Sequence, residues 1–211
     1  MRAVLLSLFT ILCLLLAVAP AMAGAFYSNG PINGTTEAWT INSGFSVTDS
    51  FSVPDLYAIA DLHIGVWLFP GDTVSSVQMD IGTSPFGTNV FSGVLTATGS
   101  TDLGTNQHGY DIQQVDFEFW PAVAGGGSYW LTLSNAVAPS GDPIYWDENS
   151  GVGCWGGGCP STAYENTVGS IPSEAFTMTG PIKLTPEPSS IMLFGSGILG
   201  LAGLLRRKVN V

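Results

Sequence analysis

The stretch FSVTDSFSV, residues 45–53, indicates how this chain folds. Its apolar members Phe45, Val47, Phe51 and Val53 share one parity, and serine or threonine occupies every position of the other parity. Because successive side chains of a β-strand point to opposite faces, the pattern predicts a strand with one buried and one solvated face. The same alternation recurs in four further segments: Leu62, Ile64, Val66 and Leu68; Val77, Met79 and Ile81; Val115, Phe117 and Phe119; and Tyr129, Leu131 and Leu133.

Clusters of turn-forming residues separate these segments, at residues 42–44, 70–72, 84–87, 104–106, 125–127 and 140–143. Their spacing of roughly ten to twenty residues suits antiparallel strands. We therefore expect an all-β domain, an antiparallel β-sandwich of about eight strands that is jelly-roll-like; an immunoglobulin-like order fits the same pattern. Residues 149–173 lack alternation and are expected to form a long loop before a last strand at 174–184.

Both ends of the chain differ from this central part. Arg2 is followed by an apolar run at residues 3–18 and by Ala21-Met22-Ala23, which has the small-x-small form of a signal-peptidase site. We expect residues 1–23 to be a signal helix for Sec export, cut after Ala23; an uncleaved anchor is the alternative. Residues 24–185 then form one domain, large enough for a hydrophobic core of its own.

The C-terminal segment, residues 186–211, has three parts: the block Pro186-Glu187-Pro188, an uncharged stretch at residues 189–205, and the basic cluster Arg206, Arg207 and Lys208. A helix over the uncharged stretch is about 25 Å long at roughly 1.5 Å per residue, the short end of what spans a bilayer. The cluster predicts a cytoplasmic end for this transmembrane helix, because basic residues stay inside. The central domain is then expected outside the inner membrane.

In this order, the Pro-Glu-Pro block, a short span with Phe194-Gly195 and Gly200-Leu201, and the basic cluster resemble the PEP-CTERM sorting signal of exported proteins in Gram-negative bacteria that make exopolysaccharide. The resemblance implies that an exosortase, a membrane-embedded cysteine peptidase, recognises the tail and cleaves near the block. The released domain would then lodge at the cell surface, in the periplasm or in the extracellular matrix. An ordinary C-terminal anchor is the alternative, but it needs neither the block nor so many glycines.

The net negative charge of the central domain limits the classes of molecule that it can bind. Lys183 is its one basic residue, whereas all 16 acidic residues of the chain except Glu187 lie in it. Such a surface repels nucleic acid and anionic membrane, because phosphate binding needs clustered lysine and arginine. Neutral glycans, including neutral exopolysaccharide, are compatible with it.

Two cysteines remain in the domain, Cys154 and Cys159, spaced Cys-Trp-Gly-Gly-Gly-Cys. In an oxidising compartment this spacing predicts a disulfide that closes a glycine-rich loop. A two-cysteine metal site is the alternative, but neither histidine is adjacent in the sequence.

Catalytic motifs are scarce. The only histidines are His63 and His108, and the domain contains neither Gly-x-Ser-x-Gly nor His-Glu-x-x-His. Asp116 and Glu118 share the outward face of one predicted strand, close enough for the acid and base of a glycosidase. Any polar strand face looks the same, so we expect a non-enzymatic domain, with a glycan-active hydrolase as the alternative.

Aromatic residues predict a binding surface. Trp67 and Trp130 stand opposite in parity to the apolar stripes of their strands, and Tyr145 and Trp146 follow a Gly-Asp-Pro turn. Flat rings stack on the C–H faces of sugars. These four residues are therefore the predicted glycan contacts; covered strands with core tryptophans are the alternative.

Oxygen ligands cluster once along the chain, at Asp142, Asp147, Glu148 and Asn149. Ca²⁺ prefers such ligands, although the spacing matches no EF-hand loop. Turn chemistry explains the same residues equally well, so we expect no cofactor, with a calcium ion at these positions as the alternative.

Overall fold

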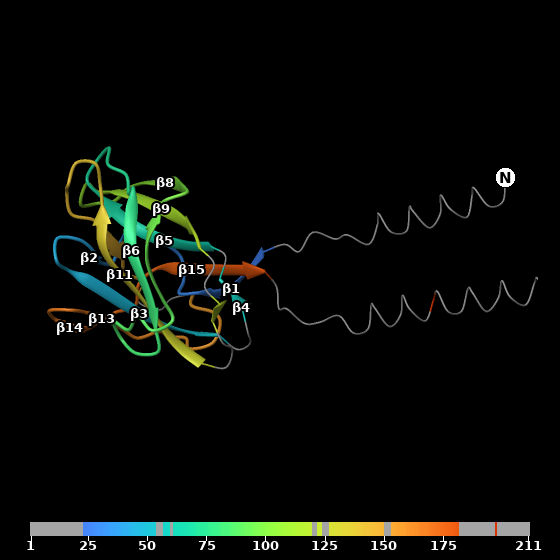
Figure 1. Ribbon diagram of the computed structural model, residues 1–211. Helices are drawn as coiled ribbons and strands as arrows, with labels where there is room; N and C mark the ends of the chain where they lie inside the picture. Colours follow the sequence, from blue (N-terminus) through green and yellow to red (C-terminus); the bar gives the residue numbers. More distant parts are fainter. Residues whose placement is uncertain are drawn as a thin grey trace, which may run out of the picture.

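The computed structural model describes residues 23–53, 57–59, 61–119, 122–123, 127–149, 153–181 and 197, and this part is nearly all β (Figure 1). Two antiparallel sheets pack face to face, as the sequence predicts. Sheet A contains β1 (Ala23–Ser28), β2 (Ala38–Thr40), β5 (Asp61–Leu68), β8 (Gly99–Thr105), β9 (Asp111–Glu118), β12 (Tyr145–Asp147) and β15 (Phe176–Pro181). Sheet B contains β3 (Ser46–Val53), β6 (Ser76–Gly82), β7 (Phe91–Thr96), β11 (Gly127–Val137), β13 (Ala163–Glu165) and β14 (Gly169–Ile171). A separate pair joins β4 (Tyr57–Ala58) to β10 (Ala122–Val123).

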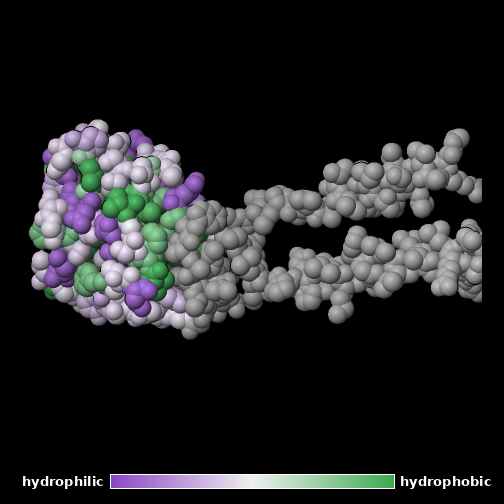
Figure 2. Space-filling model, viewed as in Figure 1, coloured by the Kyte–Doolittle hydropathy of each residue, from purple (hydrophilic) through white to green (hydrophobic). Residues whose placement is uncertain are grey.

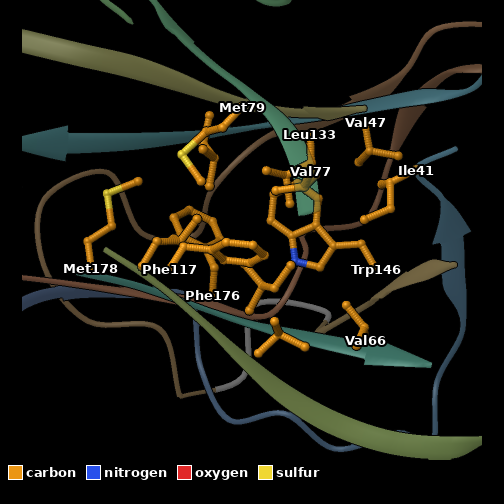
Figure 3. Close-up of a cluster of buried hydrophobic side chains, with 14 of the residues drawn as sticks. Ile41, Val47, Val66, Val77, Met79, Phe117, Leu133, Trp146, Phe176 and Met178 are labelled. Atoms are coloured by element: carbon orange, nitrogen blue, oxygen red, sulfur yellow. The ribbon is translucent and has the colours of Figure 1, made fainter. Parts of the chain in front are cut away.

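The core lies between the sheets and is built from the predicted apolar stripes. Every member is buried except Phe45, which is 40% exposed because β3 begins one residue later and Phe45 closes a turn onto the Asn42 carbonyl. Rings fill the centre: Trp146 and Phe176 lie 5.7 Å apart between centroids, next to Phe117 (Figure 3). Burial of these large side chains is the main stabilising term of the sandwich.

Two segments and the number of strands differ from the prediction. Residues 149–173 are not one long loop, because β13 and β14 form a hairpin on the edge of sheet B, next to β3. The expected turn at residues 104–106 is a bulge within β8 at Gly104, where φ is +101°, and the chain reverses after Asn106. Many observed strands are only two or three residues long, so the strands outnumber the eight expected from alternation.

The disulfide forms as predicted, with the Cα atoms of Cys154 and Cys159 5.7 Å apart. Its loop touches both sheets. Trp155 exchanges two backbone hydrogen bonds with Ser28, at the end of β1, and the Gly157 carbonyl accepts one from Ser52 on β3. The loop therefore fastens one edge of sheet A to sheet B.

The first and last strands of the domain are neighbours: β1 pairs with β15, with Ala23 opposite Pro181. The chain thus enters and leaves the sandwich at one place (Figure 1). The predicted signal segment before Ala23, the Pro-Glu-Pro block and, apart from Gly197, the predicted helix at 189–205 lie outside the described residues. Among the residues that are described, no helix has the length and apolar character needed to cross a membrane.

Candidate functional site

The outer face of sheet A carries a pocket of about 410 Å³. Its walls come from β2 and the segment before it, from β5, from β12 and from the turn after β8. The lining residues are Thr36, Glu37, Ala38, Trp67, His108, Tyr110 and Tyr145. Aromatic rings therefore dominate a concavity that also offers hydroxyl, carboxyl and imidazole groups, the usual composition of a small-molecule site.

Strand pairing brings the pocket rings together. Tyr145 on β12 lies directly opposite Trp67 on β5, so both side chains leave the sheet on the same outer face. Tyr110 packs against Tyr145 at 5.5 Å and 71°, and His108 stacks on Trp67 at 5.9 Å and 21°. The rings thus form one continuous aromatic cluster.

Trp67 forms the floor of this cluster rather than an exposed platform. Its side chain points out of the core, as its parity predicts, but it is only 6% exposed because neighbouring loops cover it. Its Nε1 donates to Asp147 Oδ1 at 2.6 Å. A buried hydrogen bond to a carboxylate fixes the orientation of the indole ring.

Asp147 also holds the loop beside the pocket. Its carboxylate accepts the backbone N–H groups of Asn33 and Gly34, at 2.9 Å and 3.1 Å. Burial raises the pKa of Asp147, while these donors and Trp67 oppose the increase. The fixed loop leads directly to Thr36 and Glu37 in the pocket wall, so Asp147 positions the pocket without lining it.

The hydroxyl of Tyr145 is a hydrogen-bond donor at the mouth of the site. Burial, with Tyr110 and Asp142 as smaller contributors, raises its pKa above the ordinary value. The phenol therefore stays protonated at neutral pH and can donate to a ligand oxygen.

Two of the predicted glycan contacts are not in this pocket. Trp146 is fully buried between the sheets and donates its Nε1 proton to the Ala175 carbonyl at 3.0 Å. Neighbours in a strand face opposite sides, so Trp146 and Tyr145 cannot both be outward. Trp130 is outward but on sheet B, where its ring packs on Tyr164 at 5.6 Å. Only Trp67 and Tyr145 are brought together.

The predicted carboxylate pair lies away from the pocket. Asp116 accepts hydrogen bonds from His63 Nδ1 at 2.6 Å and from Gln114 Nε2 at 2.9 Å. Glu118 is exposed on the same strand. Neither carboxylate lines the pocket, and Asp116 is held by protein groups.

The predicted calcium ligands do not form one cluster either. Asp147 faces Trp67, Glu148 accepts from Trp39 Nε1 at 3.4 Å, and Asn149 donates to the Pro31 carbonyl. Asp142 lies in the turn before β12 and its carbonyl accepts from Asn42. Within the described ranges, no three His, Cys, Asp or Glu side chains are grouped so that they could hold one metal ion.

Sequence reasoning missed Glu37, His108 and Tyr110, because they come from connecting segments that carry no alternation. It also passed over Asp49, which has the same parity as Val47 and Phe51 in the opening stretch and is fully buried. An acidic residue within an apolar stripe can be recognised from the sequence alone, so the burial of Asp49 could have been predicted.

The surface around the sandwich is mixed in character: hydrophilic and hydrophobic residues alternate over the face shown in Figure 2. No large apolar area suggests itself on that face as a docking surface. The concave aromatic pocket is therefore the best candidate site of the domain.

Comparison with known families adds the C-terminal tail. Residues 184–208 match the family model of the PEP-CTERM protein-sorting motif, which confirms the resemblance noted in the sequence. The comparison with curated proteins finds no match. The chain is thus an exported protein with a C-terminal sorting signal. It carries the PEP-CTERM motif, whose processing enzyme is an exosortase.

Proposed function

We propose that the domain is a non-enzymatic carbohydrate-binding module, delivered to the cell envelope or extracellular matrix and specific for neutral glycan. The aromatic pocket of sheet A carries this proposal. Tyr110 and Tyr145 offer ring faces to sugar C–H groups, while Thr36 and Glu37 offer oxygen atoms to sugar hydroxyls. The pocket volume falls in the range of about 300–1,000 Å³ that is usual for ligand sites.

The charge of the domain supports a neutral ligand. Each acidic group of a charged polysaccharide would meet a domain that holds 15 of the chain's 16 carboxyl side chains, all except Glu187. Repulsion of this kind disfavours anionic partners. A neutral polymer avoids it and can still hydrogen-bond to Glu37.

Binding is tested with the full-length chain on an array of neutral and acidic glycans. Tyr145→Ala removes a pocket wall and should weaken binding of any neutral glycan at least about tenfold, equivalent to about 1.4 kcal/mol. Tyr164→Ala is the matched control, because Tyr164 packs on the outer face of sheet B and should leave affinity unchanged. Equal losses in the two variants, or binding confined to acidic glycans, would contradict the proposal.

The proposal that the domain does not cleave its ligand is tested separately. The glycan that binds best is incubated with the protein and its chain length is followed by mass spectrometry. We expect no shortening, since the carboxylates Asp116 and Glu118 lie outside the pocket. Shortening that is lost in Asp116→Asn would instead establish the hydrolase alternative.

We also propose the route of delivery: Sec export with cleavage after Ala23, transient anchoring in the inner membrane by the helix at 189–205, and exosortase cleavage near Pro186. The matched sorting motif supports the last step. Mass spectrometry of the released protein should find Gly24 as its first residue and a C-terminus between Pro186 and Ser190. An intact tail on the released form would refute processing at this position.

A further inference from the structure

Three acidic side chains lie at core positions inside the sandwich. Asp49 is on β3, in the apolar stripe between Val47 and Phe51. Glu174 precedes β15 by two residues and pairs across an antiparallel bridge with Glu148, which follows β12. Asp49 and Glu174 are fully buried and Glu148 almost fully. Acidic groups of both sheets therefore meet in the interior.

Hydrogen bonds fix one oxygen of Asp49 and leave three other carboxylate oxygens without a partner. Asp49 Oδ2 accepts from Asn29 Nδ2 at 2.9 Å and from the Glu174 backbone N–H at 2.7 Å. Asn29 Nδ2 also donates to the Glu174 carbonyl at 2.6 Å. Asp49 Oδ1 and both carboxylate oxygens of Glu174 are buried and have no hydrogen-bond partner.

No lysine or arginine among the described residues neutralises this cluster. The part of the chain that the structure describes contains neither lysine nor arginine, since Arg2, Lys183, Arg206, Arg207 and Lys208 all lie outside it. Both histidines are engaged on the outer side of sheet A, His63 with Asp116 and His108 with Trp67.

The pKa values reflect this isolation. Burial, opposed by hydrogen bonds from Glu174, Ser161 and Ser50, raises the pKa of Asp49 to about 7. Burial, then the charges of Asp49, Glu148 and Asp147, raise the pKa of Glu174 well above its usual range. An unpaired buried carboxylate costs several kcal/mol in general, so each of these groups needs either a proton or a counter-charge.

We propose that Asp49 and Glu174 bind one Ca²⁺ ion in the interior of the sandwich. The available ligands are all hard oxygens, which Ca²⁺ prefers, and no thiol or imidazole that would favour a transition metal is among them. Neutral oxygens are also at hand: Tyr27 and Asn29 are joined by a hydrogen bond beside Asp49, and the buried hydroxyl of Ser161 lies near enough to Asp49 to oppose the rise of its pKa.

The proposed ligand set is smaller than a cage of three acidic side chains, in agreement with the absence of such a group among the described residues. It also differs from the set at 142–149 that the sequence suggests. The ion would join β3 of sheet B to the segment before β15 of sheet A, so it would stabilise the contact between the sheets.

Thermal unfolding of the full-length protein tests the site, with CaCl₂ as the probe and EGTA as the reference. For a dissociation constant of about 1 mM, typical of extracellular calcium modules, 10 mM CaCl₂ favours the folded state about elevenfold. In a chain of this size the melting temperature should then rise by roughly 3–6 °C. MgCl₂ at the same concentration should raise it less, because Mg²⁺ loses its water ligands reluctantly.

Glu174→Gln keeps the side-chain shape but removes the charge, so its calcium-dependent shift should vanish. Asp142→Asn is the matched control: this residue of the sequence-predicted set lies outside the interior cluster, so its variant should keep the full shift. Equilibrium dialysis of the unmodified chain, expected to bind one Ca²⁺ with a dissociation constant of about 1 mM, gives a result even if the Gln variant does not fold. No calcium shift in the unmodified chain, an unchanged shift in Glu174→Gln, or a shift lost in Asp142→Asn would each overturn the proposal.

Discussion

Replacing Gly65 by alanine tests how tightly the loop at residues 29–37 covers sheet A. Gly65 lies on β5 with its missing side chain directed toward this loop. A Cβ atom there would lie 2.7 Å from Ile32 Cγ2, 2.8 Å from Ile32 Cγ1 and 3.1 Å from Asp147 Cβ. Contacts this short do not persist between carbon atoms, so one group must move.

The expected loss of stability depends on how easily Ile32 and its loop can move away from the new Cβ atom. Ile32 is branched at Cβ, so both of its close atoms are stiff, and the next two residues of its loop are bonded to Asp147. Overpacking of this kind costs about 1–3 kcal/mol, and the lower entropy of the unfolded alanine chain returns about 0.4–1 kcal/mol. We expect the free energy of unfolding to fall by about 1–2 kcal/mol, measured by urea denaturation and circular dichroism.

Two further variants separate this contact from a general effect of glycine replacement. Gly99→Ala is the matched control in an exposed strand, where the new Cβ meets only one atom, Asp116 Oδ2, at 3.3 Å; its stability should be unchanged or slightly higher. Ile32→Ala should remove most of the cost of Gly65→Ala. The reasoning fails if Gly65→Ala costs the same in both backgrounds, or no more than Gly99→Ala does.

Three further variants probe the disulfide, one carboxylate and the core. Replacing Cys154 and Cys159 by serine should lower the free energy of unfolding by roughly 2 kcal/mol, the chain-entropy value for so short a loop, measured by urea denaturation. Glu165→Gln should lower the free energy of unfolding at neutral pH but not in acid. Burial raises the pKa of Glu165, but hydrogen bonds from residues 166–168 lower it by more, so the pKa lies below 4.5. The stabilisation by the ionised Glu165 carboxylate is complete above the pKa of the unfolded chain and is lost as the pH falls through the lower pKa of the folded chain. Plots of unfolding free energy against pH for the unmodified protein and for Glu165→Gln should therefore converge at acid pH. Trp146→Ala should cost about 3–5 kcal/mol, whereas Trp155→Ala, at a ring that is 48% exposed, should cost far less in the same denaturation assay.

The core of the sandwich could be predicted because it depends on a local rule. Val47, Leu131 and Phe117 are buried for the reason that their strands alternate, and alternation is visible without knowing any partner strand. Strand β8 shows the limit of that rule. All residues of β8 are exposed, so no alternation of apolar and polar residues identifies it as a strand. It is recognisable as a strand only by its pairing with β9.

The pocket could not be predicted in full, because it is assembled by pairing between distant segments. Tyr145 reaches Trp67 only when β12 adds to β5, and Glu37 arrives from the segment before β2 on the other side of β12. Trp146, in contrast, could have been assigned to the core from its parity with Ile144. Asp49 could likewise have been recognised as a buried charge, although which acids face it depends on how the two sheets pack.

The pairing of β1 with β15 has a consequence for the timing of export. Sheet A is complete only after residue 181 has crossed the membrane, because its first strand must wait for its last. Four residues then separate Pro181 from Pro186, so these two prolines are at most about 18 Å apart at about 3.3–3.6 Å per residue step. Sheet A therefore cannot close before nearly the whole domain has been exported, and on the proposed route a peptidase acting at the Pro-Glu-Pro block would cut within a few residues of the last strand.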